Sequence, residues 1–519
     1  MSMLLAVATE TFTEGAHPLP VLLPVVVLTF AVLAMLAAMY RPTWGKAVAG
    51  IGAIAGFALA LLALFVAMGA DEPIRHLFGG WDLQERGEQL NLDIPIGIHY
   101  VLDDLAAYMA VIIMGVGGLA VLFPDRPGLG FRPTAGTPVY TLQLVLLAGL
   151  LGVVLSGDLF HLFVFLEIYA IATYALIAMG NTRSVYASFR YLLIGTTGSA
   201  FYLIGVGCVY FSTGSLNMAE LANELLPQLH HSPAIIGAAV LITVGLAIKM
   251  ALFPLHIWLP EAHANAPPAV AALLAAVQVK VGAYALIRVL NGVFGTEFAL
   301  HQLPLGHILL AFSATGILVG SILAVRQDDF KRLLAYSTVA QLGYIGVGIA
   351  LGTPAALVGG LMHVLAHALA KSCLFFVAGC VYDQTHVRLT ARYAGLGKRM
   401  PLLMAGMTIA MIGMIGIPPT LGFFSKFYLV LATIEAGHWF VGAVLVGASV
   451  LTAIYFLGVL EQVWLKEPVD EAVGTSREPT LPALLPVLIL AVAVLVLGLG
   501  NYYLTDLLLS PLAERVIGP

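Results

Sequence analysis

The chain has 519 residues, of which 60% are hydrophobic and only 10% charged, and its mean hydropathy is +0.98. A soluble domain carries about a quarter charged residues, so this composition excludes a soluble globular protein. The net charge of −5 indicates no particular partner, because most charged residues fall in short loops between apolar runs. The composition predicts an all-α polytopic membrane protein.

Apolar runs of about twenty residues recur along the whole chain, each long enough to cross roughly 30 Å of hydrocarbon. They predict about fourteen transmembrane helices, at residues 19–40, 46–69, 104–123, 138–157, 159–180, 189–212, 234–258, 268–291, 304–325, 330–351, 355–382, 401–434, 438–464 and 480–506. Residues 70–103 have Gly and Asp punctuation and partial alternation, which predict a hairpin over the outer face. The N-terminus lacks a basic segment, so no cleaved signal peptide is expected.

The distribution of basic residues predicts the orientation in the membrane. Of the 23 Lys and Arg residues, four lie deep inside predicted spans, and four fall on the outer side: Arg75, Arg86, Arg288 and Arg515. The other fifteen fall on the inner side, as the positive-inside rule requires of a correct helix count. Both termini are therefore predicted to face outward.

Five charged side chains lie deep inside predicted spans: Glu167, Lys249, Lys280, Lys371 and Lys426. A charge at the bilayer centre costs at least ~2.5 kcal/mol, so a functional role is expected. The alternatives are snorkelling or purely structural pairing, but these residues lie too deep for snorkelling, and one glutamate cannot neutralise four lysines. Burial of an unpaired amine favours its neutral form and so permits proton exchange.

Prolines accompany two of these lysines. Pro254 follows Lys249, and Pro418 and Pro419 precede Lys426. Proline breaks the helical hydrogen-bond ladder, and broken helices at membrane depth are tolerated where they are buried or line a wet cavity. The breaks fall in the seventh and twelfth spans, five apart, a spacing that indicates inverted five-helix repeats as in transporters. Proline kinks that serve packing alone are the alternative.

His363, His367 and Lys371 recur at every fourth position of the eleventh span. They line one helix face over roughly 12 Å and form a short ladder of proton-exchanging groups. The alternative is a metal or haem site. However, Val364 follows the first histidine where zinc hydrolases of the HExxH type need a glutamate, a third ligand is missing nearby, and adjacent turns of one helix cannot bracket a haem.

Further polar residues are candidates for access or relay of protons. They are His256 and His263 after the first break, and Ser337, Thr338, Gln341 and Tyr344 in the tenth span. Interfacial placement or polar helix packing is the alternative for each of them.

Several stretches resemble the antiporter-like subunits shared by Mrp-type multisubunit cation/proton antiporters, respiratory complex I and membrane-bound hydrogenases. They are DLFHLFVFLEIYAIATYALIAMG, KMALFPLHIWLPEAHANAPPAVAALLAAVQVKVGAY, DDFKRLLAYSTVAQLGY, HVLAHALAKSCLFFVAG and GIPPTLGFFSKF. The resemblance covers roughly residues 100–430. It implies fourteen core helices, with helices 4–8 and 9–13 as inverted five-helix repeats and with helices 7 and 12 broken.

The resemblance also implies roles for the buried charges. Glu167 and Lys249 match the residues that form a switching ion pair in this family, Lys280 matches the eighth-helix lysine, and Lys426 matches the last residue of a central hydrophilic axis. The resemblance places His363, His367 and Lys371 of the eleventh span between Lys280 and Lys426. Lysine at 426 argues against the complex I subunit type that carries glutamate there, and the overall similarity is greatest to the D-type subunit of Mrp antiporters.

These observations predict four parts: helices 1–3 with the outer hairpin in residues 1–135, the first repeat in 136–300, the second in 301–465 and helix 14 in 466–519. The expected function is a proton-translocating subunit of a multisubunit Na⁺/H⁺ antiporter in a bacterial or archaeal cell membrane. Its expected partners are other membrane subunits, a homologous antiporter-like subunit among them, together with monovalent cations, protons and the lipid bilayer, but no nucleic acid. No catalytic chemistry, cofactor or metal is expected. The alternatives are a proton-pumping subunit of a redox complex or of an inorganic-carbon uptake complex.

Overall fold

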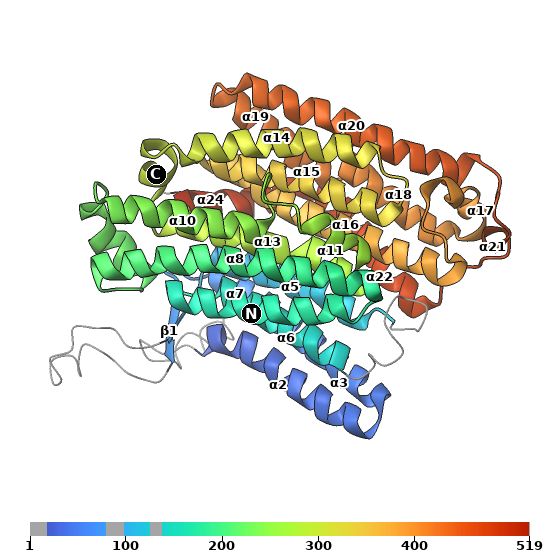
Figure 1. Cartoon of the computed structure of the whole chain (residues 1–519), viewed down its shortest axis with the longest axis horizontal. Helices are drawn as coiled ribbons and strands as arrows, with labels where there is room; N and C mark the ends of the chain where they lie inside the picture. The colour runs from blue at the N-terminus through green and yellow to red at the C-terminus, as the bar shows by residue number, and fades with distance from the viewer. Residues whose placement is uncertain (1–17, 79–97, 125–137, 518–519) are drawn as a thin grey trace.

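A computed structural model describes residues 18–78, 98–124 and 138–517 of the chain. Its helices lie side by side along a common direction, with α2 and α3 at one edge of the bundle and α19 and α20 at the other (Figure 1). In the described residues, twelve helices are long and apolar enough to cross a membrane, and Pro138–Val154 and Pro401–Ile415 are shorter apolar helices. Together they correspond to the fourteen predicted spans, so the predicted fold class is confirmed.

The first six spans are continuous helices. They are α2 (Leu19–Tyr40), α3 (Pro42–Met68), α5 (Asp104–Leu122), α6 (Pro138–Val154), α7 (Leu159–Ala178) and α8 (Thr182–Thr213). Helix α8 begins well before the predicted residue 189, because the side chain of Asn181 caps it by accepting a hydrogen bond from Ser184 N at 3.1 Å.

The seventh span is broken, as the prolines predict. Helix α10 (Pro233–Met250) ends where Ala251 takes a left-handed conformation with φ 59°, and helical structure resumes at α11 (Leu259–Asn265). The eighth span consists of α12 (Pro268–Leu273), the π-helical turn η4 (Leu274–Gln278) and α13 (Val279–Gly292). Short elements on either side are α9 (Met218–Glu220), η2 (Leu221–Leu225), η3 (Leu226–Gln228) and η5 (Glu297–Gln302).

The second half repeats this pattern. It contains α14 (Leu305–Val325), α15 (Phe330–Ala350), α16 (Pro354–Thr385), η6 (Thr390–Tyr393), α17 (Leu396–Arg399), α18 (Pro401–Ile415), α19 (Leu421–Glu435), α20 (Trp439–Leu465), α21 (Glu471–Gly474) and α22 (Leu481–Leu499). The second predicted break separates α18 from α19 and begins at Gly416, whose φ of 89° suits glycine. Residues 268–292 and helices α15 and α16 are the most deeply buried spans, so they form the centre of the bundle.

The predicted outer hairpin is present in the part of the loop that the structure describes. Strands β1 (Ile74–Phe78) and β2 (Ile98–Leu102) pair antiparallel, with Ile74 opposite Leu102; the connecting residues 79–97 lie outside the described ranges. The predicted end of the last span at 506 is wrong, because α22 ends at Leu499. The chain continues as α23 (Asn501–Leu504), η7 (Thr505–Leu509) and α24 (Ser510–Ile517), which packs on α16 and α13.

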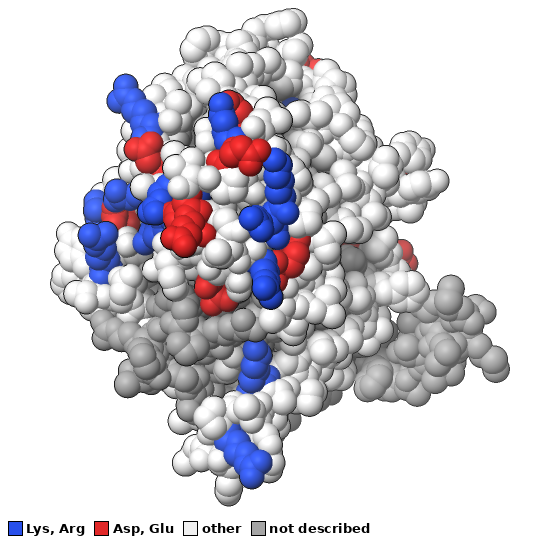
Figure 2. All heavy atoms as spheres, turned by 90° about the vertical axis from the view of Figure 1, so that its right-hand side faces the viewer, with Lys and Arg blue, Asp and Glu red and all other residues white. Residues whose placement is uncertain are grey.

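Charged side chains lie at both ends of the bundle. The end that carries α17 and α21 shows interleaved basic and acidic side chains (Figure 2), and its ion pairs include Arg388–Asp329 at 2.8 Å and Lys398–Glu467 at 2.6 Å. At the opposite end, β1 and α24 carry basic residues that the sequence assigns to the outer side. The sidedness in the membrane stays a prediction.

Glycines bring the broken helices close to their neighbours. A Cβ atom at Gly422 would lie 1.9 Å from the carbonyl oxygen of Gly413, so α19 can approach α18 only with glycine there. A Cβ atom at Gly245 would likewise lie 2.6 Å from Gly198 O, between α10 and α8. Such small-residue contacts are typical of transmembrane packing and fix the positions of the lysines that follow each contact.

Candidate functional site

Glu167 and Lys249 form an ion pair between α7 and α10. Lys249 Nζ lies 3.3 Å from Glu167 Oε1, and the same carboxylate oxygen accepts a hydrogen bond from the Ser199 hydroxyl on α8. Lys249 is fully buried one residue before the end of α10, whereas the Glu167 side chain is 25% exposed. The structure thus brings the first two predicted residues together at the helix break.

Lys280 lies behind this pair at the centre of the bundle. Its ammonium group donates to the carbonyl oxygen of Ala275, in the π-helical turn η4 just before it. A π-turn disturbs the regular helical ladder and leaves carbonyl groups available to other donors. Within the described residues, Lys280 has no carboxylate partner.

Lys371 is fully buried on α16 and is held from α15. Its Nζ donates hydrogen bonds to Leu334 O at 2.7 Å and to the Ser337 hydroxyl. Ser337, a predicted relay residue, therefore contacts a buried lysine directly. Thr338 instead donates to Leu334 O of its own helix at 2.9 Å and makes no described contact with the buried charges.

Lys426 lies at the second break. Its Nζ donates to Met414 O at 2.8 Å and to Ile415 O at 3.1 Å, the last carbonyl groups of α18, and lies 3.3 Å from the Ser449 hydroxyl. The C-terminus of a helix carries partial negative charge, so α18 stabilises the ammonium group without a carboxylate. The Tyr344 ring lies 4.9 Å from the same nitrogen.

The two histidines of α16 differ in their partners. The His363 ring nitrogens contact the Ser425 hydroxyl at 2.9 Å and Gln341 Oε1 at 3.0 Å, so this ring is not free to bind a metal. Both nitrogens of the buried His367 lack a protein partner among the described residues, and buried groups of this kind are commonly satisfied by water. The two rings are parallel, with centroids 6.2 Å apart.

His263 connects this centre with the charged end of the bundle. It is completely buried on α11, has no described partner for either ring nitrogen, and lies within electrostatic reach of Lys280, Lys371 and Lys331. His256, the other predicted access residue, lies in the break itself and stacks on Phe253 at 5.3 Å.

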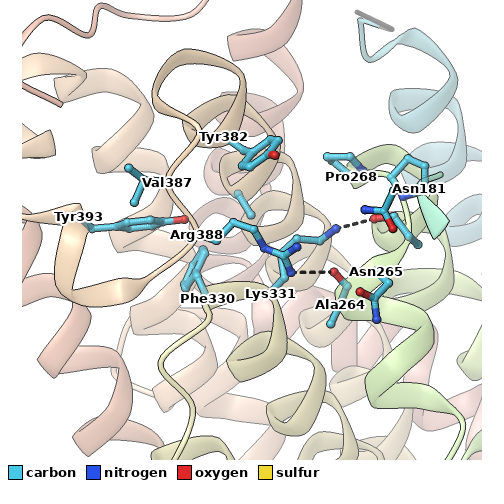
Figure 3. A pocket seen from close by; sticks show the side chains of 13 residues that line it. Asn181, Ala264, Asn265, Pro268, Phe330, Lys331, Tyr382, Val387, Arg388 and Tyr393 are labelled. Carbon is cyan, nitrogen blue, oxygen red and sulfur yellow. Dashed lines mark hydrogen bonds between the residues drawn. The ribbon is translucent and has the colours of Figure 1, made fainter. Parts of the chain in front are cut away.

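A cavity of about 70 Å³ lies at this charged end, and Ala264 and Asn265 of α11 line it (Figure 3). Lys331 and Arg388 reach into it and donate to the carbonyl groups of Ala266 and Ala264, with Asn265 beside them. Ala264, which lines the cavity, directly follows His263 on α11.

Sequence reasoning missed several polar partners. Ser199 and Ser425 contact Glu167 and His363, and Gln278 donates to Tyr191 and accepts from Thr173 at 3.0 Å between the first two lysines. Ser425 directly precedes Lys426 and Gln278 lies two residues before Lys280, so adjacency to a buried lysine is the signal that points to them. Ser199 carries no comparable signal.

We call the set Glu167, Lys249, Lys280, His367, His363, Lys371 and Lys426 the buried axis. An ion pair, two broken helices and a line of buried basic groups, on a bundle with fourteen apolar spans in the described residues, define an antiporter-like membrane subunit. The chain belongs to the family described as NADH:quinone oxidoreductase/Mrp antiporter, transmembrane, which matches residues 156–452.

Two relatives represent both branches of that description. The N subunit of NADH-quinone oxidoreductase from Desulforudis audaxviator is 46% identical over 94% of this chain and 96% of its own length. The D-type subunit of the Na⁺/H⁺ antiporter from Alkalihalophilus pseudofirmus is 32% identical over 95% and 97%. The expected similarity to the D-type antiporter subunit is thus present, but that subunit is not singled out.

Solved structures show the same fold. A chain of the Mrp complex from a Dietzia species superposes with a TM-score of 0.85 at 26% identity, covering 97% of both chains. A chain of an archaeal membrane-bound sulfane sulfur reductase has a TM-score of 0.85 at 30% identity, over 96% of this chain and 98% of that one. Both are multisubunit membrane complexes, so other membrane subunits are plausible partners.

Proposed function

We propose that this chain translocates protons along the buried axis as one subunit of a multisubunit membrane complex. One observation carries the proposal: Lys280, Lys371 and Lys426 are buried at the centre of the bundle and bind carbonyl and hydroxyl oxygens, with no described carboxylate partner. A structural ion pair would fix the charge on both partners, whereas an amine held by neutral oxygens can lose its proton without leaving a buried carboxylate behind.

The ion pair at the first break is the proposed switch. While Glu167 and Lys249 are in contact, each stabilises the charge of the other. Separation of the pair favours the neutral form of Lys249, because a buried ammonium group loses its counter-charge. Its proton then moves towards Lys280, and the histidines of α16 carry it on to Lys426.

Access from one membrane side is proposed at the cavity beside His263. The ring interacts electrostatically with Lys331, which lines the cavity, and with Lys280 and Lys371 in the axis. In this arrangement Lys371 and His263 form a branch from the axis to the charged end of the bundle, which we place on the inner side of a bacterial or archaeal cell membrane with both termini outside.

The energy source distinguishes two candidate complexes. The sequence motifs favour a monovalent cation/proton antiporter, in which Na⁺ moves against protons. The 46% identity to the N subunit of an NADH-quinone oxidoreductase favours a redox-driven complex instead. The same axis serves both, because the electron-transfer groups or the cation path would lie on other subunits.

Transport by the purified complex in vesicles tests the proposal. A pH-sensitive dye reports proton movement after addition either of a Na⁺ gradient or of an electron donor with a quinone, and only one of the two should drive it. Glu167→Ala and Lys249→Ala should each abolish proton movement, whereas Lys398→Ala removes an exposed lysine of a surface pair and should not. Wild-type transport by both axis variants in an assembled complex would refute the switch.

A further inference from the structure

His363 is the residue of the axis whose hydrogen bonds the structure defines at both ring nitrogens. Nε2 faces Gln341 Oε1 at 3.0 Å, and Nδ1 faces the Ser425 hydroxyl at 2.9 Å. A carbonyl oxygen only accepts hydrogen bonds, whereas a hydroxyl group can donate or accept. The two sides of the ring are therefore chemically different.

Gln341 fixes a proton on Nε2 in both charge states of the ring. A neutral His363 that donates from Nε2 presents a bare Nδ1, which must accept a hydrogen bond. A charged His363 carries hydrogens on both nitrogens and needs an acceptor at Nδ1. The proton that His363 gains and loses is consequently the one on Nδ1, on the side of α19.

Ser425 can satisfy Nδ1 in either state because its hydroxyl has a second partner. Its oxygen lies 3.0 Å from Gly422 O, one turn back on α19. When the ring is neutral the hydroxyl donates to Nδ1; when the ring is charged the hydroxyl turns to donate to Gly422 O and accepts from Nδ1. Only the rotation of one hydroxyl separates two fully hydrogen-bonded arrangements.

The position of Ser425 is fixed independently of this contact. Gly422 packs against Gly413 of α18, which leaves no room for α19 to shift towards it. Ser425 is completely buried, and its neighbour Lys426 is anchored on the last carbonyl groups of α18. The hydroxyl is therefore held in place beside His363.

We propose that Ser425 is a positioning residue of the axis, whose hydroxyl turns with the charge state of His363 and stabilises its doubly protonated form beside Lys426. The inference rests on the proposed function, since it assumes that His363 carries protons. Ser425 itself keeps its proton and is no carrier.

Titratable groups face His363 from several packed elements. Lys426 faces it from α19, Lys280 from α13, Tyr344 from α15, where the rings are 5.2 Å apart, and His367 from its own helix. Removal of the Ser425 hydroxyl changes none of these charges. A change in pH dependence on its removal thus reports the hydroxyl alone.

The test measures the pH profile of proton transport by the assembled complex with Ser425→Ala, Ser425→Cys and Ser425→Thr. Alanine and cysteine remove the strong acceptor, and a hydrogen bond to a charged group is stronger than one to a neutral group. Both should move the midpoint of the profile by about one pH unit to lower pH and slow transport at neutral pH by about tenfold. Threonine keeps the hydroxyl and should stay within about twofold of wild type.

Ser321→Ala is the matched control, because that buried hydroxyl donates only to Ile317 O of its own helix at 2.7 Å. If Ser425→Ala fails to assemble, Ser425→Cys provides the measurement, since it nearly preserves the volume. An unchanged profile in these variants, while His363→Gln is inactive, overturns the role of Ser425 and leaves the proposed function intact. Wild-type transport by His363→Gln would overturn both.

Discussion

His367 is the residue of the axis whose substitution separates function from stability most cleanly. It lies one turn from His363 and one turn from Lys371 on α16, and within electrostatic reach of Lys280 and His263. Both ring nitrogens lack a protein partner among the described residues, so His367→Gln removes no described hydrogen bond. Glutamine fills a similar space and binds water, but it cannot exchange a proton near neutral pH.

The spacing of the rings sets the expected magnitude. Two charged imidazoles 6.2 Å apart repel by about 2.7 kcal/mol at an effective dielectric constant of about 20. Simultaneous charging of His363 and His367 is thereby disfavoured about a hundredfold, so in the proposed path a proton leaves one ring as the next takes it. Without His367, the gap between His363 and Lys371 is eight residues of one helix, or roughly 12 Å.

We therefore expect His367→Gln to lower proton transport about a hundredfold, within the range that a positioned proton-transfer group contributes, while thermal stability stays unchanged. Dye-based transport and a melting curve of the same purified complex provide the two measurements. His307→Gln, at an exposed histidine of α14, should affect neither. Transport at the wild-type rate in the His367→Gln complex would show that protons bypass His367.

Lys371→Met should abolish transport and leave the melting temperature unchanged or higher. Methionine fills the space of the lysine side chain, and Leu334 O still accepts a hydrogen bond from the Ser337 hydroxyl at 3.1 Å. A large loss of stability would contradict the view that Lys371 is held only by neutral oxygens. At the opposite end, burial raises the pKa of Asp103, but the two hydrogen bonds from Arg288, at 2.6 and 2.7 Å, more than offset it and hold this pKa below its usual value. Asp103→Asn should therefore lower the melting temperature above about pH 4, where the wild-type carboxylate is charged, and the difference should disappear at lower pH as that carboxylate protonates. A deficit independent of pH would exclude the ion pair as its cause.

Hydropathy and proline placement predict the fold closely because the bilayer allows few solutions. Helices must satisfy their own backbone in hydrocarbon, so apolar length fixes the spans, and Pro254 and Pro419 mark the two breaks. The same signal misses α24, since Ser510–Ile517 is short and amphipathic and looks like a polar tail. It packs against α16 and α13 and buries Leu512 and Ala513, a tertiary contact that no local pattern records.

The sequence predicts the charged residues of the candidate site but not the residues that hydrogen-bond to them. A lysine inside an apolar span identifies itself, whereas a serine does not, because most serines in such helices bond to their own backbone. Ser321 and Ser372 do so, and Ser425 does so as well while also reaching His363. The same kind of pattern makes Thr338 a relay candidate, yet the structure shows it bonded within its own helix.

The hydrogen-bond partners of the four buried lysines differ along the axis, which the sequence alone does not show. Only the first lysine is held by a carboxylate among the described residues; the others are held by carbonyl groups that a π-turn, a helix end or a hydroxyl-rich turn makes available. A carboxylate can be pulled away, because Glu167 is partly exposed on α7, whereas backbone carbonyls cannot move independently of their helices. In the proposed mechanism, a change in charge therefore begins at Glu167 and Lys249 and spreads inward, which gives the axis a direction. Because Glu167 is partly exposed, a neighbouring subunit packed against it would, in the proposed mechanism, act on the switch directly.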